Sequence, residues 1–214
     1  MSKKSYLYSG LFVGIFIATL VIFYWFFKSP YFLIVDTWVK ANIVLYVIYL
    51  FIYKSIGVLF PPIPAGLVTM ASIPFLGWFN AYLVDFFGSL FGGIIAYFLG
   101  KKYGHPLLNK ILGSDLTEKI EKVKIKKDKE IEGVFVYRLA FGSTILEAIY
   151  YGAGFLKIGF KNFLIGSTLS HIVIGVPSFF LANNILNGQN ITFTIILTIV
   201  GIMFVIFTKG RYFE

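Results

Sequence analysis

Long apolar runs separated by short polar segments fill most of this chain. The runs cover about residues 7–27, 41–60, 78–100, 155–182 and 191–207. Each is near the roughly 20 residues that an α-helix needs to cross a hydrocarbon core about 30 Å thick. The pattern predicts an all-α polytopic membrane protein, with about five transmembrane helices in one membrane domain that spans residues 1–214.

Two further apolar stretches, 60–75 and 134–154, contain residues that break helices or carry charge. In lipid these residues would leave backbone groups or charges unsatisfied, so such segments persist only inside protein or beside a water-filled cavity. We therefore expect two re-entrant hairpins. The residues concerned are Pro61, Pro62, Pro64, Arg138 and Glu147.

A weak internal echo relates the two halves of the chain, with a hairpin before a long span in each. Transporters built from inverted repeats place their site where discontinuous helices of both halves meet, so the echo predicts that the two hairpins converge. Chance similarity between segments rich in Phe and Leu is the alternative. The first copy is Phe75-Leu76, Phe79 and Tyr82-Leu83, and the second is Phe155-Leu156, Phe160 and Phe163-Leu164.

Composition excludes a soluble protein, because 58% hydrophobic residues and a mean hydropathy of +0.83 cannot be hidden inside 214 residues. The net charge is +9, and the segment 101–132 holds nine lysines against six acids. These lysines lie beside predicted spans and form no nucleic-acid motif, so membrane headgroups are the expected partner and nucleic acid is not. The absence of cysteine excludes disulfides and cysteine-ligated metals.

The third apolar run carries a stripe of small residues at every fourth position, which predicts close helix packing. Asp85 lies on or beside this stripe and should face protein, as a structural polar contact or as a coupling residue together with Glu147. His171 is expected to pack between helices, and Lys54 is expected to extend to the membrane surface. The stripe consists of Gly88, Gly92, Ala96 and Gly100.

Arg138 is one of only two arginines in the chain and has no charged neighbour until Glu147. A guanidinium holds a phosphate or carboxylate through two parallel hydrogen bonds, so Arg138 is the candidate residue for binding an anionic substrate. The alternative is an internal salt bridge to Glu147 or Asp85. The other candidate substrate-binding residues are Pro62, Pro64, Gly66 and Gly152.

Enzyme activity is not expected. Ser143, Ser167 and Ser170 could supply a nucleophile for His171, but no nucleophile elbow accompanies them. Metalloprotease spacing, a phosphate-binding glycine loop and acidic metal clusters are absent from the sequence. No cofactor or metal is therefore predicted.

Several short motifs between residues 60 and 175 resemble the DedA proteins and their relatives, the SNARE-associated Golgi or VTT-domain proteins. Arg138 and Gly152 keep the fourteen-residue spacing of that family's second block. The first-block motifs are Pro62-Ile63-Pro64-Ala65-Gly66, Gly92-Gly93 and Tyr97-Phe98-Leu99-Gly100-Lys101-Lys102-Tyr103-Gly104.

The chain also departs from the family pattern. Gly66 and Gly93 stand where the family has acids, and Phe141 and Thr144 stand where it has a proline and a second arginine. The sequence is thus similar to the divergent branch of the family. Proton coupling through the usual acids is in doubt, and Asp85 and Glu147 are hypothetical substitutes.

The resemblance implies a protein of the cell membrane with two opposed re-entrant hairpins that moves lipids, as a phospholipid scramblase or a polyprenyl-phosphate carrier. The expected partners are anionic membrane lipids, and association with a second copy of the chain is left open. Two alternatives are a proton- or cation-coupled transporter of a small solute and a non-transporting membrane organiser that grips acidic lipids through its lysines.

Overall fold

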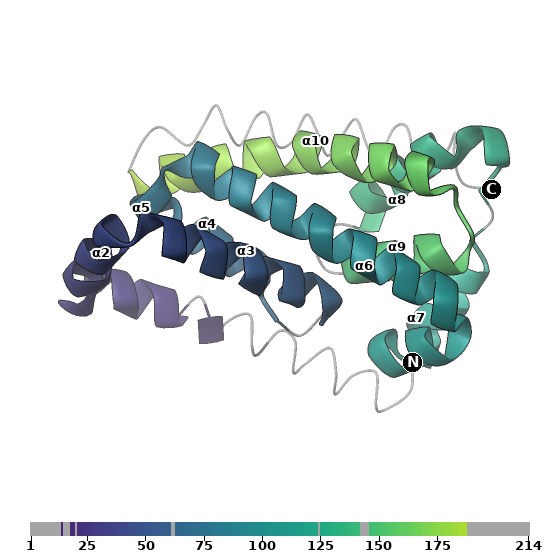
Figure 1. Cartoon of the computed structure of the whole chain (residues 1–214), viewed down its shortest axis with the longest axis horizontal. Coiled ribbons are helices and arrows are strands. Elements are labelled where there is room, and N and C mark those ends of the chain that lie inside the picture. Colours follow the sequence, from purple (N-terminus) through teal and green to yellow (C-terminus); the bar gives the residue numbers. More distant parts are fainter. Residues whose placement is uncertain are drawn as a thin grey trace.

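The computed structural model describes residues 14, 18–19, 21–60, 63–123, 125–141 and 146–187, and these form helices without a strand (Figure 1). Residues 21–28 are helical. The elements that follow are α2 (Tyr31–Ala41), α3 (Ile43–Leu59), α4 (Ala65–Ala71), α5 (Ile73–Leu76), α6 (Trp78–Leu112), α7 (Ser114–Glu121), the 3-10 helix η1 (Lys127–Lys129), α8 (Glu130–Phe141), α9 (Leu146–Phe155) and α10 (Phe160–Leu186).

The long helices α6 and α10 run antiparallel through the middle of the molecule, and α3 lies along α6 (Figure 1). Aromatic contacts fix the direction of the pair. Trp78 at the start of α6 meets Phe180 near the end of α10, with ring centroids 5.6 Å apart. Tyr97, further along α6, stacks on Phe163 at the start of α10, at 4.8 Å.

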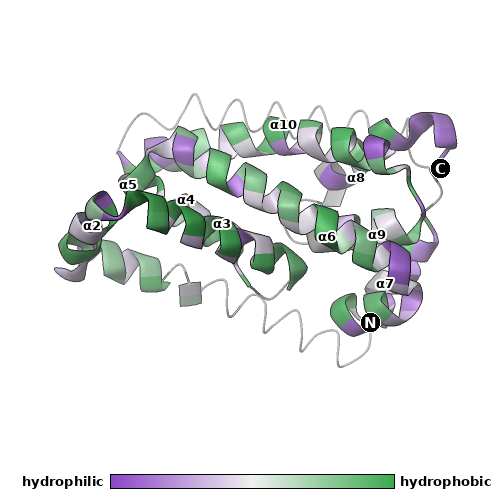
Figure 2. Cartoon of the chain, viewed as in Figure 1, coloured by the Kyte–Doolittle hydropathy of each residue, from purple (hydrophilic) through white to green (hydrophobic). Residues whose placement is uncertain are grey.

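The predicted all-α membrane class is confirmed. Within the described residues, α6 and α10 are each long and apolar enough to span a membrane, and the pair α2–α3, bent by 104°, adds a third span if it counts as one. Hydrophobic residues occupy the length of these helices (Figure 2), and the outward phenylalanines of α6 are about half exposed. The predicted outer runs, 7–27 and 191–207, lie wholly or mostly outside the described residues.

Two helix boundaries differ from the prediction. α6 continues to Leu112 instead of ending near residue 100. Lysine favours the helical conformation, and its charged head group can reach water where the helix leaves the bilayer. The helix bends at Gly104, whose φ of 55° and ψ of −139° suit glycine. The last described long helix begins at Phe160 instead of 155, because Lys157 adopts a positive φ and separates it from α9.

Pairs of short helices occupy the two stretches where hairpins are predicted. α4 and α5 precede α6, and α8 and α9 precede α10. The two copies of the internal echo both fall where the short helices end and the long helix begins. Residues 61–62 and 142–145 of these stretches lie outside the described part of the chain.

Buried apolar residues form two clusters, one toward each end of the bundle. One cluster includes Leu50, Tyr82 and Phe179, and the other includes Val58, Tyr97 and Phe163. Between the clusters, α3, α4, α6, α8 and α10 each contribute buried polar residues. We call this set the polar layer; it consists of Lys54, Ser55, Thr69, Asp85, Ser89, Arg138, Ser167, Ser170 and His171.

Glycines set the closest helix contacts. A Cβ at Gly88 would lie 2.8 Å from the Lys54 Cβ, and one at Gly100 would overlap the Tyr151 carbonyl of α9. Gly154 of α9 packs in return on the Tyr97 carbonyl of α6, and a Cβ at Gly166 of α10 would lie 2.8 Å from the Ile131 carbonyl of α8. The stripe on α6 therefore lies where α6 meets α3 and α9.

The replacement Gly92→Ala is expected to destabilise the bundle. The new Cβ would lie 2.5 Å from the Ser55 carbonyl oxygen and 2.9 Å from the Val58 Cβ, so α3 and α6 would have to separate. Overpacking of this kind costs about 1–3 kcal/mol. Thermal unfolding in detergent checks this, with Gly66→Ala as control because its Cβ would meet only the Lys54 Nζ, at 3.5 Å. Equal melting temperatures for the two variants would contradict it.

Candidate functional site

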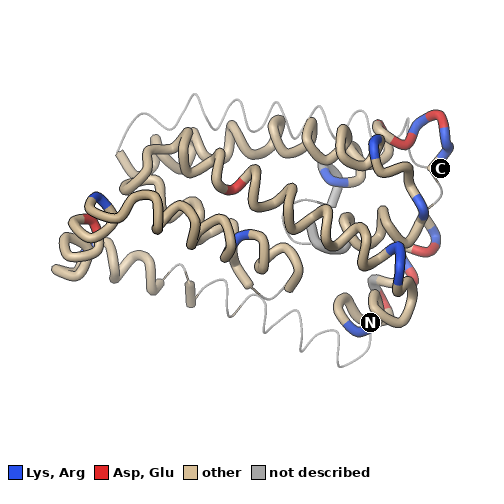
Figure 3. Tube along the Cα trace, viewed as in Figure 1, with Lys and Arg blue, Asp and Glu red and all other residues tan. Residues whose placement is uncertain are grey.

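Charged residues gather at the end of the molecule that holds α7 and η1, and few interrupt the middle of the long helices (Figure 3). The charged members of the polar layer are Lys54 on α3, Asp85 on α6 and Arg138 on α8, each at most 5% exposed. Buried charges in a membrane protein are costly and mark functional positions by default. The polar layer is therefore the candidate site.

Lys54 and Asp85 form a buried ion pair, with 2.6 Å between Nζ and Oδ1. The predicted surface position of Lys54 is wrong. Gly88 allows α3 to approach α6 so closely that the lysine stem crosses directly to the carboxylate one turn earlier on α6. Gly66 at the start of α4 lies over the same ammonium group, since a Cβ there would be 3.5 Å from Nζ.

Two further groups complete the surroundings of Asp85. The Thr69 hydroxyl of α4 donates to Oδ1 at 2.5 Å, and His171 Nε2 of α10 lies 3.2 Å from Oδ2. His171 also packs edge-on against the Phe86 ring. Asp85 thus ties α3, α4 and α10 to α6, and His171 joins this network in addition to packing between helices.

Arg138 is only 3% exposed and is held by neutral groups. Its Nη1 donates to the Tyr150 hydroxyl at 2.6 Å and to the Ser167 carbonyl at 3.1 Å. Within the described part of the chain, its Nε has no hydrogen-bond partner. No carboxylate of the described residues lies within 4 Å of the guanidinium, so the alternative of a salt bridge to Asp85 is not realised. The Glu147 side chain lies outside the described part of the chain.

The two buried cations belong to one polar region. Ser167, whose carbonyl binds Arg138, is one helical turn before His171, which touches Asp85. Among its described charged side chains, the polar layer has two basic residues, Lys54 and Arg138, and one carboxylate, Asp85. With these three residues charged and His171 neutral, the net charge of the polar layer is +1, and a bound anion would balance that charge.

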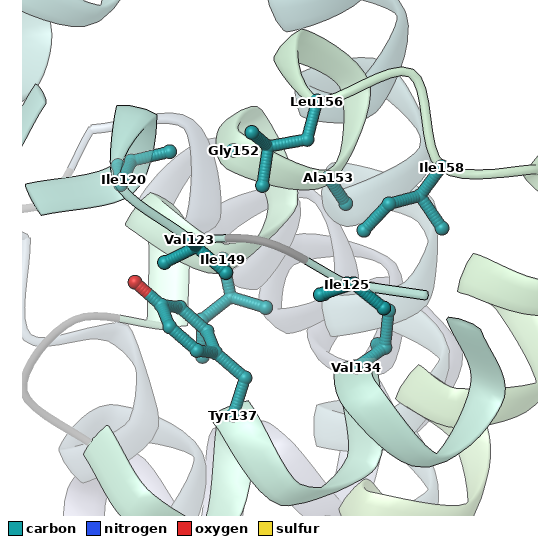
Figure 4. Close-up of a pocket in the computed structure, with 10 residues that line it drawn as sticks. All are labelled: Ile120, Val123, Ile125, Val134, Tyr137, Ile149, Gly152, Ala153, Leu156 and Ile158. Atoms are coloured by element: carbon teal, nitrogen blue, oxygen red, sulfur yellow. The ribbon is translucent and has the colours of Figure 1, made fainter. Parts of the chain in front are cut away.

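The other predicted site residues are dispersed. Pro64 is the N-cap of α4, two residues before Gly66, and Pro62 lies outside the described residues. Gly152 lies away from the charges, in the wall of a small apolar cavity (Figure 4) that α7, α8 and α9 form with the loop after α7. Ile120 of α7 covers Gly152 there, since a Cβ at Gly152 would lie 3.1 Å from its side chain.

Sequence reasoning missed several members of the site. Thr69, Ser89 and Tyr150 carry no signal in a single sequence, because a hydroxyl in an apolar run is common. Lys54 does carry a signal, because a charged residue inside a predicted span needs a partner. The stripe of small residues on α6 indicates a helix that could approach closely enough to provide one. The described residues contain no group of three or more side chains suited to hold a metal ion.

Comparisons with known proteins agree with this picture. A family model described as VTT domain matches residues 47–183, more than half of the chain. An uncharacterised protein of Methanocaldococcus jannaschii is 29% identical over 117 residues, which cover 54% of this chain and 70% of that protein. No solved structure matches. The family match and the apolar helices identify an integral membrane protein.

Removing either partner of the buried ion pair should strongly destabilise the protein, and removing both should cost less than the sum of the two single losses. Lys54→Met and Asp85→Asn should each lower the free energy of unfolding by about 3–5 kcal/mol, because each leaves an uncompensated buried group. The double variant should lose clearly less than the sum, which a double-mutant cycle on unfolding in detergent measures.

The exposed pair of Asp36 and Lys40 on α2 is the matched control. Its atoms are also 2.6 Å apart, but the Lys40 side chain is 70% exposed, so its removal should change stability by less than about 1 kcal/mol. Additive losses at Lys54 and Asp85 would show that the two residues do not act as a pair.

Proposed function

Because the chain belongs to the VTT-domain family, we propose that it moves lipids with anionic headgroups across the cell membrane, as a phospholipid scramblase or a polyprenyl-phosphate carrier. The lipid is bound, moved and released without covalent change. The finer architecture in this proposal has two opposed re-entrant hairpins, formed by the stretches around α4–α5 and α8–α9, within about five spans.

One observation carries the proposal: Arg138 is a buried cation without an anionic partner among the described residues. Even on mild insertion scales a charged arginine at the membrane centre costs about 2.5–3.5 kcal/mol, so an unpaired one needs a compensating role. A phosphate headgroup supplies the missing negative charge. It can also accept from the Nε that lacks a partner, because guanidinium groups bind phosphate through parallel hydrogen bonds.

The apolar surface suits the rest of a lipid. α3, α6 and α10 expose large hydrophobic side chains on the faces turned away from the polar layer, including Ile52, Phe91 and Val173. Acyl or prenyl chains can remain against such surfaces in the bilayer while the headgroup crosses near Arg138. Because only the headgroup would enter the polar layer while the chains stay in the bilayer, one small polar layer would suffice for a large lipid.

The described structure represents a closed arrangement for this function. Arg138, Asp85 and His171 are each at most 5% exposed, so a headgroup reaches the layer only after the surrounding helices part. Alternating opening of two repeats around a fixed site is the usual solution in transporters. The convergence of α4 and α8 residues on the polar layer supports such a site between the two halves.

A second candidate function is the coupled transport of a small solute. The specific observation in its favour is Asp85, a buried carboxylate that touches both Lys54 and His171 and could exchange a proton with its surroundings during turnover. Solute uptake that depends on pH and is abolished by Asp85→Asn, without lipid movement, would favour this function over lipid translocation.

Arg138→Lys should reduce translocation of labelled anionic lipid by at least about tenfold, because a lysine keeps the charge but not the planar pair of donors. The measurement uses liposomes with purified protein and compares an anionic phospholipid, a polyprenyl phosphate and a lipid without phosphate. Only the first two should depend on Arg138.

Lys101→Ala is the control, because this lysine is exposed and lies outside the polar layer. Both variants must have the melting temperature of the wild type within a few degrees for the comparison to count. Unchanged movement of anionic lipids by a folded Arg138→Lys protein would refute the role of the guanidinium in headgroup binding.

A further inference from the structure

Two buried serines in the polar layer leave their hydroxyl groups unpaired. Helical serines and threonines usually donate to a backbone carbonyl one turn earlier, which satisfies the hydroxyl inside the helix. Ser89 and Ser167 are fully buried, yet neither Oγ has a hydrogen-bond partner among the described residues. The other buried serines and threonines of the described residues all have a partner. Thr69 donates to Asp85, and the remaining four donate to a backbone carbonyl about one turn earlier, at Ser55, Ser72, Thr117 and Ser170.

Ser167 contacts Arg138, and Ser89 lies on a neighbouring helix, on the side that packs against Tyr150. The Ser167 carbonyl accepts from Arg138 Nη1, so this serine is in direct contact with the guanidinium. Ser89 is one turn before Gly93, which packs on the Tyr150 ring; a Cβ at Gly93 would lie 3.1 Å from that ring. Tyr150 in turn accepts from the same Nη1. Ser89 thus lies on the α6 face that packs against Tyr150, a hydrogen-bond partner of Arg138.

The unpaired atoms are a set of donors within the polar layer. Arg138 Nε and the hydroxyls of Ser89 and Ser167 offer three hydrogen bonds from α8, α6 and α10. A buried hydroxyl without a partner is costly, and an alanine would avoid that cost at either position. We propose that Ser89 and Ser167 complete, with Arg138, a site for a tetrahedral phosphate group.

The site rests on the proposed function, because it names the group of the lipid that the polar layer would bind. Phosphate offers several oxygens in a tetrahedral arrangement, so it can accept from three helices at once, whereas a carboxylate offers two oxygens in one plane. The same chemistry would bind the headgroup of a phospholipid or of a polyprenyl phosphate, and it would also bind inorganic phosphate. The probes of the experiment separate these sources.

The experiment measures binding to the purified full chain in detergent by calorimetric titration. The probes are inorganic phosphate, a short-chain phosphatidic acid and the matching diacylglycerol without phosphate. Ser89→Ala and Ser167→Ala should each weaken binding of phosphatidic acid about tenfold, as expected for a hydrogen bond to a charged group. Diacylglycerol should show no dependence on either serine.

Ser178→Ala is the matched control, since this α10 serine already donates to the Ile174 carbonyl at 2.7 Å. Thermal unfolding without ligand separates binding from structure. Loss of an unpaired buried hydroxyl should leave the melting temperatures of Ser89→Ala and Ser167→Ala unchanged or raised. Clearly lowered melting temperatures for both would assign the serines a structural role, such as holding buried water, and would overturn the site.

Binding and transport fail in distinguishable ways. Wild-type affinity for phosphatidic acid in the double serine variant, or no binding of either phosphate probe by the wild type, would overturn the site. If the double variant still moves anionic lipids at the wild-type rate, lipid translocation stands and the serine site falls. If the wild type binds inorganic phosphate with serine dependence but does not bind phosphatidic acid, the phosphate site stands and the lipid function falls.

Discussion

A carboxylate and two basic side chains inside an apolar bundle need partners, and the positions of the helices follow from that constraint. The Asp85 carboxylate contacts Lys54 of α3, Thr69 of α4 and His171 of α10, so it holds three helices against α6. Arg138 similarly joins α8 to α9 and α10 through Tyr150 and Ser167. The apolar clusters on either side then exclude other partners from these groups and strengthen their electrostatic interactions.

Small residues make this arrangement possible. Between lipid-facing helices there is little hydrophobic driving force, so van der Waals packing and hydrogen bonds must hold them together. Gly88 and Gly92 bring α3 within reach of α6, which shortens the path from the Lys54 backbone to Asp85. A larger side chain at Gly88 would push the ammonium group away from the carboxylate. The stripe on α6 therefore serves both the packing and the charge pairing.

The sequence predicts the elements better than it predicts their partners. Apolar runs locate α3, α6 and α10, and the isolation of Arg138 points to the candidate site, because both signals are local. The pairing of Lys54 with Asp85 depends on how α3 is aligned along α6, which hydropathy does not contain. Hydropathy predicts too early an end for α6, because Lys101 and Lys102 are polar but do not break helices. Whether the Ser89 hydroxyl bonds to its own backbone is a matter of rotamer, which no sequence pattern reports.

The glycine contacts also divide the bundle mechanically. Gly92, Gly100 and Gly154 fasten α3 and α9 to α6 backbone against backbone, and Gly166 fastens α8 to α10 in the same way. The seam between these two bodies is made instead by adaptable aromatic side chains such as Trp78, Phe163 and Phe180. Rigid bodies move most easily at the interface that side chains form, because side chains can repack. Motion at this seam, between the α3–α6–α9 body and the α8–α10 body, would part Arg138 from Tyr150 and His171 from Asp85 in a single step. The moving interface of the molecule would then coincide with the line of buried charge in the described residues.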